Sequence, residues 1–304
     1  MPHSVFMLGK GGTGKTTLAT LLAISASQSA RKVLLASLDP AHNLSDILET
    51  RIHSEPTRIM KGFEAMEVSL DFWVEKYLKQ TAKAIRRNYQ YLTALTLDGY
   101  FDLYRHTPGL EEYGLLMVYR ELTSISGDLD YIILDMPPTA LSMQFFRLPA
   151  LSAVWLEKLS ELRNQILQKR EIISRIKLGK LTIEEDKPLV LIQKRLKEFR
   201  TLTGNFQNPA LNTFELICNP DPLSLNEAVD IAEKFNDWNF KISHLLVNKS
   251  VKGYNSISLP SPLKNFPVVQ VKSATRPLTG LNDLIEFVSQ NRLIFQNLLP
   301  QIKS

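Results

Sequence analysis

The residues Gly9-Lys10-Gly11-Gly12-Thr13-Gly14-Lys15-Thr16-Thr17 have the types and the spacing of a phosphate-binding loop. In such loops, backbone N–H groups at the start of a helix converge on phosphate oxygens. Lys15 stands where a lysine reaches the terminal phosphates, and Thr16 stands where a hydroxyl holds Mg²⁺. We therefore predict ATP and Mg²⁺ as cofactors, bound by Gly11, Gly12, Thr13, Gly14, Lys15, Thr16 and Thr17.

Lys10 is a second cation in the same loop, beyond the one that the phosphate chemistry requires. A lysine acts well as a point charge toward phosphate. We interpret Lys10 as a residue that reaches a phosphate, either of its own nucleotide or of one across a dimer interface. The alternative is a solvated loop lysine.

Two aspartates follow apolar runs, and each therefore stands at the end of an expected strand. Asp39 comes after the second run and Asp135 after the fourth. ATP hydrolysis needs a polar group that orients the attacking water and a carboxylate that holds Mg²⁺ or its water shell. Asp39 suits the first task and Asp135 the second. A helix cap is the alternative role for Asp39, and equally for Asp46.

Short apolar runs separated by helical stretches predict the fold class. Runs without polar alternation are typical of strands that are buried on both faces, as in a parallel sheet. We expect an α/β fold of the P-loop NTPase type, with a doubly wound, mainly parallel sheet, helices on both faces and an added helical subdomain. The expected strands lie at 5–8, 33–36, 66–69, 131–134, 214–218, 242–247 and 268–271.

Two helical stretches interrupt the rhythm of the strands. We assign 1–150 and 205–304 to the ATPase core, which includes the helical stretch 70–125, and 151–204 to a basic amphipathic helical insertion. The insertion holds 12 Lys or Arg and 7 Asp or Glu, which equals the whole +5 net charge of the chain. Such a run forms either a solvated face or a surface for an acidic partner, nucleic acid or lipid.

The amino-acid composition limits which classes of protein the chain can belong to. A content of 44% hydrophobic and 22% charged residues is that of a soluble globular protein, and we expect a cytoplasmic one because no leader or membrane span is recognised. The single cysteine, Cys218, reads as a buried strand thiol. The apolar stretch 281–299 is expected to pack on the sheet; a membrane-attaching helix is the alternative.

The loop from Lys10 to Thr17, together with Asp39-Pro40-Ala41-His42-Asn43-Leu44-Ser45-Asp46, resembles the family of arsenite-pump ATPases and tail-anchored-protein targeting ATPases. The second motif distinguishes this family from the partitioning ATPases, which share only the phosphate-binding loop. Asp135-Met136-Pro137-Pro138-Thr139 is similar to the second switch of the family. Two later segments also match: 219–228 resembles a strand-loop-helix of the family, and 244–249 resembles the strand whose terminal asparagine reads adenine.

The resemblance implies a homodimer that sandwiches nucleotide, because this chain has one such loop. It also implies that Lys10 contacts phosphates of the partner subunit, that Asp39 positions the hydrolytic water, that Thr16 binds Mg²⁺ and that Asn248 contacts adenine. Two departures narrow the chemistry. Ala140-Leu141-Ser142 replaces the Gly-His-Thr common in the family, and one cysteine can supply neither a three-thiolate arsenite site nor a zinc-bridged dimer.

We therefore predict an ATP hydrolase whose open and closed states are coupled to a protein client with a hydrophobic segment, with transient association with a membrane. The segments 70–125 and 151–204 would supply the client groove, although the apolar face of the insertion could equally be ordinary core. The alternative is a partitioning- or positioning-type regulatory ATPase that acts on DNA or a membrane surface. We do not expect nucleic acid as the main partner.

Overall fold

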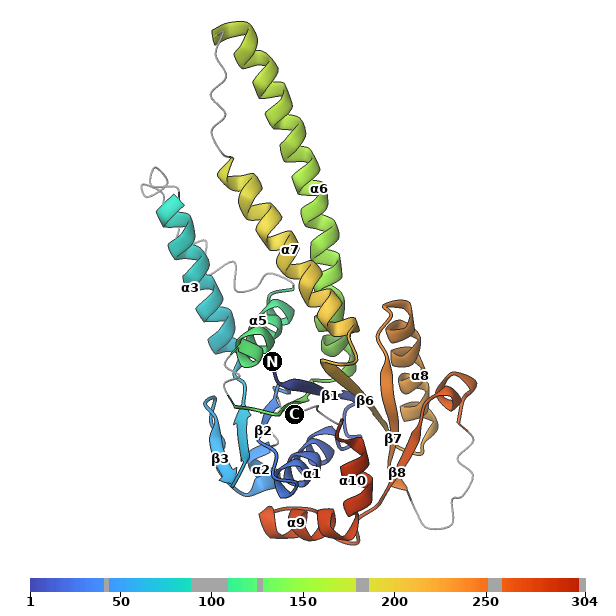
Figure 1. Cartoon of the computed structure of the whole chain (residues 1–304). Coiled ribbons are helices and arrows are strands. Elements are labelled where there is room, and N and C mark those ends of the chain that lie inside the picture. Colours follow the sequence, from blue (N-terminus) through green and yellow to red (C-terminus); the bar gives the residue numbers. More distant parts are fainter. Residues whose placement is uncertain (41–43, 89–108, 125–127, 179–185, 251–258, 301–304) are drawn as a thin grey trace. The chain divides into compact units, whose positions relative to one another are not determined.

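The computed structural model describes residues 1–40, 44–88, 109–124, 128–178, 186–250 and 259–300, and its elements are labelled in Figure 1. It contains one sheet of eight strands in the order β3-β4-β2-β5-β1-β6-β7-β8. All pairs are parallel except β3 with β4. The strands are β1 (His3–Gly9), β2 (Val33–Ser37), β3 (Thr57–Met60), β4 (Phe63–Glu67), β5 (Tyr131–Asp135), β6 (Asn212–Cys218), β7 (Ile242–Ser250) and β8 (Val268–Lys272).

The central strands carry apolar side chains toward both faces of the sheet. Every residue of β1, β2, β5 and β6 is buried, which explains why these runs show no polar alternation. The expected strand at 66–69 is wrong by a few residues: β4 begins at Phe63, where it pairs with Val33. Gly62 makes the turn from β3, a short edge strand that the sequence analysis did not predict.

Helices cover both faces of the sheet, as the predicted fold class requires. One face carries α1 (Lys15–Gln28), α9 (Leu281–Gln290) and α10 (Arg292–Leu298), which share a core with Val5 and Met7 of β1. Leu284, Val288 and Phe295 are completely buried, so the C-terminal apolar stretch packs on the body of the protein. Among the described residues, no helix is both long and apolar enough to span a bilayer.

The opposite face is built around aromatic rings. Phe6 of β1 lies 5.5 Å from Tyr119, 6.4 Å from Phe145 and 5.1 Å from Phe214, measured between ring centroids. Tyr119 belongs to α5 (Leu110–Ser124), which packs with α3 (Leu70–Asn88), and Phe145 belongs to α6 (Thr139–Leu178). The remaining helices are α2 (Leu44–Leu48), α7 (Lys187–Gln207), α8 (Pro222–Asp237) and the short η2 (Ser261–Asn265).

The chain divides into two compact units, Met1–Phe145 with Pro209–Ser304, and Phe146–Asn208. The predicted insertion 151–204 lies inside the second unit. Its first helix, α6, is longer than expected: it begins at Thr139 and continues through Pro149. Its second helix, α7, has Asp186 as N-cap, and Arg163 of α6 holds this carboxylate with two hydrogen bonds of 3.0 and 2.8 Å.

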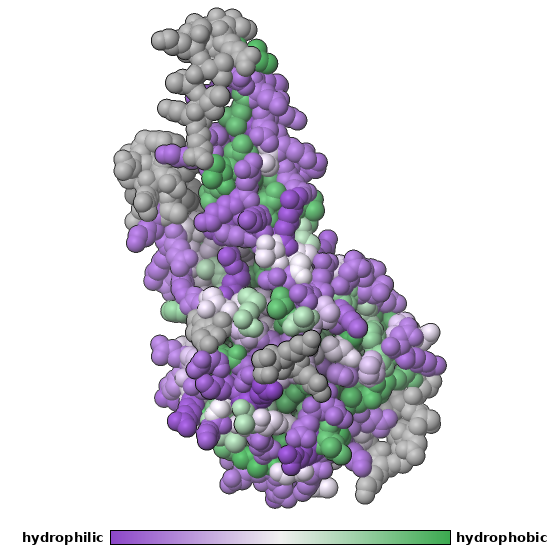
Figure 2. Space-filling view, viewed as in Figure 1, coloured by the Kyte–Doolittle hydropathy of each residue, from purple (hydrophilic) through white to green (hydrophobic). Residues whose placement is uncertain are grey.

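Large apolar side chains of the second unit are exposed. Leu151, Val154, Trp155, Leu162 and Ile166 of α6 are between 46% and 65% exposed. Figure 2 shows apolar side chains emerging between hydrophilic ones along these helices. These residues were expected to form one face of an amphipathic helix. They do form one face, but it is not buried in this structure.

A hydrogen-bonded pair of a glutamate and a histidine joins two neighbouring strands of the sheet. Glu215 of β6 is completely buried and faces His244 of β7, whose Nδ1 lies 2.9 and 3.2 Å from the two carboxylate oxygens. The hydrogen bond with Glu215 raises the pKa of His244. The stability from the protonated histidine is therefore complete below its unfolded pKa of about 6.5 and is lost as pH rises through the folded value.

Replacing His244 with alanine is expected to lower the free energy of unfolding by about 3 kcal/mol, because a buried carboxylate is left without its partner. In a Glu215→Gln background the same change should cost less than about 1 kcal/mol. Chemical denaturation of the four proteins at pH 6.5 measures this coupling. Equal losses in the two backgrounds would contradict it.

Candidate functional site

The phosphate-binding loop connects the carboxyl end of β1 with the first residue of α1. Gly14 caps α1 with φ 90°, a left-handed conformation that favours glycine. Gly9 also has positive φ, 147°, and a Cβ atom there would collide with the carbonyl oxygen of Ile217 in β6. The loop therefore lies directly on the neighbouring strand, at the edge of the sheet where ligands of such folds bind.

Hydrogen bonds inside the loop converge on one carbonyl group. The Lys10 carbonyl oxygen accepts bonds from the Thr13 hydroxyl at 2.8 Å, the Thr13 N–H at 3.3 Å and the Lys15 ammonium at 3.3 Å. Thr13 is 1% exposed and Lys15 is 5% exposed, while Gly11 and Gly12 are exposed. The turn is thus closed from within, and its glycine backbone stays accessible to a phosphate group.

Two residues near the end of β7 form hydrogen bonds with the backbone of the phosphate-binding loop. The Asn248 amide donates to the Thr13 carbonyl oxygen at 2.7 Å, and the Lys249 ammonium donates to the Gly12 carbonyl oxygen at 3.0 Å. The Asn248 side-chain oxygen accepts from its neighbour's N–H at 2.9 Å. The structure thus places Asn248 against the loop; its contact with adenine stays a prediction.

Asp135 is completely buried at the end of β5 and pairs in register with Ser37 of β2. Its Oδ2 accepts a hydrogen bond of 3.2 Å from Ser37, whereas its Oδ1 has no hydrogen-bond partner in the part of the chain that the structure describes. Burial raises the pKa of Asp135 to about 6, against the opposing effects of the Thr16 hydroxyl and the Lys15 charge. An orphaned buried carboxylate oxygen beside Thr16 fits a divalent cation.

Lys15 is a buried cation that interacts with several acidic groups. Burial lowers the pKa of Lys15, and the charges of Asp135, Asp39 and Glu227, in that order, raise it. Asp135 ends β5 and Asp39 follows the neighbouring strand β2, so the sheet brings them to the same edge, as the sequence predicts. Glu227 comes from α8 and was not predicted as a site residue.

We name the segments 39–46 and 135–139 the first and the second switch segment, after their resemblance to the family; they lie at the ends of β2 and β5. In the first switch segment, residues 41–43 lie outside the described residues, and the description resumes at Leu44, the first residue of α2. There Glu67, the last residue of β4, accepts hydrogen bonds from the Ser45 N–H at 2.9 Å and the Ser45 hydroxyl at 3.0 Å. Glu67 was not predicted as a site residue, because an acidic residue at a strand end gives no indication of its partner.

The second switch segment begins at Asp135, the last residue of β5, and ends at Thr139, the first residue of α6. The Ser142 hydroxyl donates to the Pro137 carbonyl oxygen at 2.6 Å, and the Thr139 hydroxyl donates to Oε1 of Glu227. Leu141, at the position where the family commonly has a histidine, is only half-buried and offers no metal ligand. Cys218 is buried, and burial raises its pKa to about 12, so this thiol is a poor metal ligand at neutral pH.

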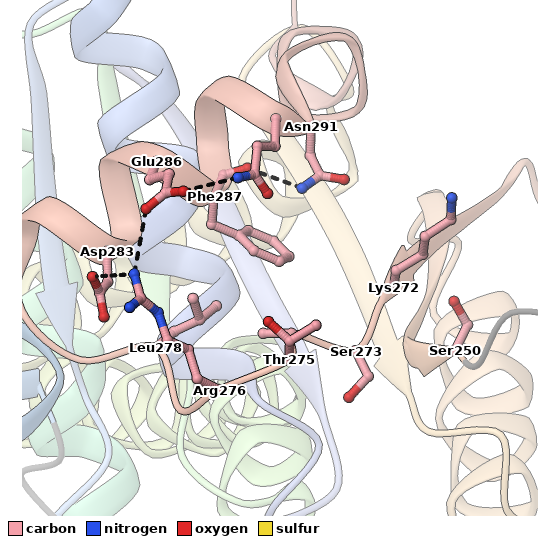
Figure 3. A pocket seen from close by; sticks show the side chains of 12 residues that line it. Ser250, Lys272, Ser273, Thr275, Arg276, Leu278, Asp283, Glu286, Phe287 and Asn291 are labelled. Atoms are coloured by element: carbon pink, nitrogen blue, oxygen red, sulfur yellow. Dashed lines mark hydrogen bonds and ion pairs between the residues drawn. The ribbon is translucent and has the colours of Figure 1, made fainter.

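A cavity opens beside the loop on the side of Asn248. It has a volume of about 410 Å³ and is lined by Gly14, Thr17, Asn248, Lys249 and the segment 271–278. A larger hollow of about 780 Å³ shares residues of this segment with it and reaches α9. Figure 3 shows how Arg276 is held there, by Asp283 at 2.9 Å and Glu286 at 3.3 Å. Such volumes are typical of small-molecule sites.

The segment 271–278 was not predicted as part of the site. Its place after an apolar run could have indicated a site there, since loops that follow parallel strands meet at the same edge of the sheet. Pro277, which precedes Gly280, indicates a loop there but does not indicate a ligand.

A model of the family described as anion-transporting ATPases matches residues 3–258. The chain belongs to this family. It is 31% identical over 250 residues to ATPase get3 of Schizosaccharomyces japonicus, which covers 81% of this chain and 74% of the relative. It is 28% identical to ATPase GET3A of Arabidopsis thaliana, over 81% and 66% of the two chains. It is 25% identical to an ATPase ASNA1 homolog of Entamoeba dispar, over 81% and 75%.

Membership in the anion-transporting ATPase family makes the protein an ATP-binding ATP hydrolase. The matched range includes β1 to β7, and therefore the phosphate-binding loop, both switch segments and Asn248. The family assignment predicted from the two motifs is confirmed, as is the α/β fold class. The roles of the individual site residues remain predictions.

Proposed function

We propose that the protein is a Mg²⁺-dependent, homodimeric ATPase that couples ATP hydrolysis to the binding and release of a protein client with a hydrophobic segment. The observation that carries this proposal is the exposed apolar face of α6, on a helix that begins in the second switch segment. Transient contact with a membrane during client release is part of the proposal.

The nucleotide site assigns a role to each of its parts. Lys15 and the loop backbone would hold the phosphates, and Asp39 would position the attacking water. The fit of Asp135 and Thr16 to a divalent cation supports Mg²⁺ there, which would supply charge neutralisation for the transferred phosphate. The cavity beside Asn248 has room for the base, and its position supports the predicted adenine contact.

The exposed apolar residues of α6 extend over a length close to that of a membrane-spanning helix. Its five exposed apolar residues and Ile172, which is 59% exposed, lie within an arc of roughly 120° on a helix of 3.6 residues per turn. We name this set the apolar stripe: Leu151, Val154, Trp155, Leu162, Ile166 and Ile172. Along the axis it extends for about 32 Å, close to the length of a 20-residue hydrophobic helix. Such a helix would bury surface that otherwise contacts water.

Client binding can be tested with a labelled peptide that carries a 20-residue Leu/Ala segment. The full-length Asp39→Asn protein with ATP is the reference, because slow hydrolysis should keep the closed state populated. Adding Trp155→Asp and Ile166→Asp is expected to weaken peptide binding at least tenfold, since a buried large apolar side chain contributes about 2 kcal/mol. Fluorescence anisotropy measures this affinity.

The matched control is Asn164→Asp with Gln168→Asp, two exposed positions of α6 outside the apolar stripe. This control adds the same charge and should bind the peptide within about twofold of the reference. Equal affinity of both double variants would contradict the proposed client surface. Salt-sensitive binding to DNA, without peptide binding, would favour the alternative partitioning ATPase.

Homodimer formation can be tested through Lys10, which is expected to act on the nucleotide of the partner subunit. Lys10→Ala and Lys15→Ala proteins are mixed in equal amounts, and ATP turnover is compared with that of each alone. In a mixed dimer one complete site forms and the other loses both lysines, so turnover should exceed the average of the two variants. Additive turnover would indicate that Lys10 acts within its own chain.

A further inference from the structure

We infer that Glu227 is a positioning residue that sets the affinity of the loop for nucleotide and links phosphate charge at Lys15 to Thr139, the first residue of α6. The inference rests on the proposed nucleotide site. It goes beyond it because Glu227 belongs to α8, outside the phosphate-binding loop and both switch segments.

The position of Glu227 is fixed by the way α8 begins. Asp221 caps the helix and accepts the Ser224 N–H at 2.9 Å, while the Ser224 hydroxyl accepts the Asn219 N–H at 2.9 Å. Ala228, next to Glu227, is buried at 2% exposure. The backbone of Glu227 is therefore placed by a capped helix that packs on the body of the protein.

Glu227 contacts the second switch segment directly and acts on the loop lysine through its charge. Its Oε1 accepts the hydrogen bond of the Thr139 hydroxyl, and its charge acts on the Lys15 ammonium. Thr139 is also the first residue of α6, where the partial positive charge of a helix N-terminus attracts an anion. The carboxylate is thus attracted by a helix end and by the cation that is expected to bind phosphate.

A phosphate group at Lys15 would compete with Glu227 for the same cation. The two anions repel each other in a region of low dielectric constant, which weakens nucleotide binding and weakens the hold of Glu227 on its partners. Because one of these partners begins α6, phosphate charge is converted into a force on the second switch segment. Asp39 and Asp135 are the other acidic groups that act on Lys15, and the Glu227 carboxylate in addition accepts the hydrogen bond of the Thr139 hydroxyl.

Two substitutions separate the charge from the hydrogen bond. Glu227→Gln removes the charge but keeps an oxygen that can accept from Thr139. Thr139→Val removes the hydroxyl but keeps the shape of the side chain and the charge of Glu227, and Thr139→Ser restores the donor. The affinity for ATP is measured by calorimetry on each full-length protein, and the turnover number is measured in parallel.

Glu227→Gln is expected to bind ATP about tenfold more tightly than the wild type. Thr139→Val should keep the wild-type affinity within about twofold and lower the turnover number severalfold, while Thr139→Ser restores it. An unchanged or weaker affinity of Glu227→Gln would overturn the inference, as would wild-type turnover of Thr139→Val. If the wild type itself binds no ATP, the nucleotide site fails, which is a different result.

Discussion

Replacing Lys15 with alanine is expected to weaken ATP binding at least about 100-fold and to leave no measurable hydrolysis. The Lys15 ammonium is buried beside the loop carbonyl of Lys10 and interacts with Asp135, Asp39 and Glu227. Truncating one partner of a buried charge pair costs about 3 kcal/mol or more, and each 1.4 kcal/mol is a factor of ten in affinity. The substitution also leaves these carboxylates to repel the incoming phosphates.

Calorimetric titration with ATP measures the loss, and Lys234→Ala, in the last turn of α8, serves as the control for removal of a lysine remote from the loop. Circular dichroism checks that the fold is retained. An ATP affinity within about threefold of the wild type would mean that Lys15 does not bind the phosphates.

Replacing Asp135 with asparagine is expected to stabilise the nucleotide-free protein and to abolish Mg²⁺-dependent hydrolysis. Burial raises the pKa of Asp135 from 3.8 to about 6, so at pH 7 the ionised carboxylate destabilises the fold by about 3 kcal/mol. Asparagine fills the same space without the charge, and it can still accept from Ser37. A site for a divalent cation would thus be maintained at the expense of stability.

The sign of the pH dependence follows from the raised pKa. Below pH 3.8 the carboxyl group is protonated in both the folded and unfolded states, and the wild type incurs no penalty. As pH rises through about 6 the penalty develops, so the stability advantage of Asp135→Asn should grow between pH 4.5 and 7.5. Denaturation in EDTA at both values measures it. An advantage that shrinks with pH, or full hydrolysis by the variant, would contradict this account.

The sequence predicted the site best where local pattern and sheet topology agree. The phosphate-binding loop was recognisable from adjacent residues, and Asp39 and Asp135 were placed together because parallel strands end at the same edge. Glu67, Glu227 and the segment 271–278 were missed as site residues because their contacts join segments far apart in the chain. The Thr139–Glu227 bond spans 88 residues, and residue spacing cannot indicate such a contact.

The helical part was predicted less well, for two physical reasons. The expected insertion began at 151, yet α6 begins at Thr139 and continues through Pro149, a residue that lacks an N–H and usually ends or kinks a helix. The three-and-four spacing of apolar residues predicted one face but not its environment. A buried face and an exposed face give the same pattern, so the sequence could not predict that residues such as Trp155 are exposed.

Helix α6 carries the apolar stripe on the same continuous element that begins at the second switch segment. The helix begins at Thr139 and continues to Leu178, a length of about 60 Å. Pro149 sits between the two ends, where a missing hydrogen bond makes the helix easiest to bend. A bend at Pro149 would therefore change the direction of the apolar stripe without unfolding either half of the helix.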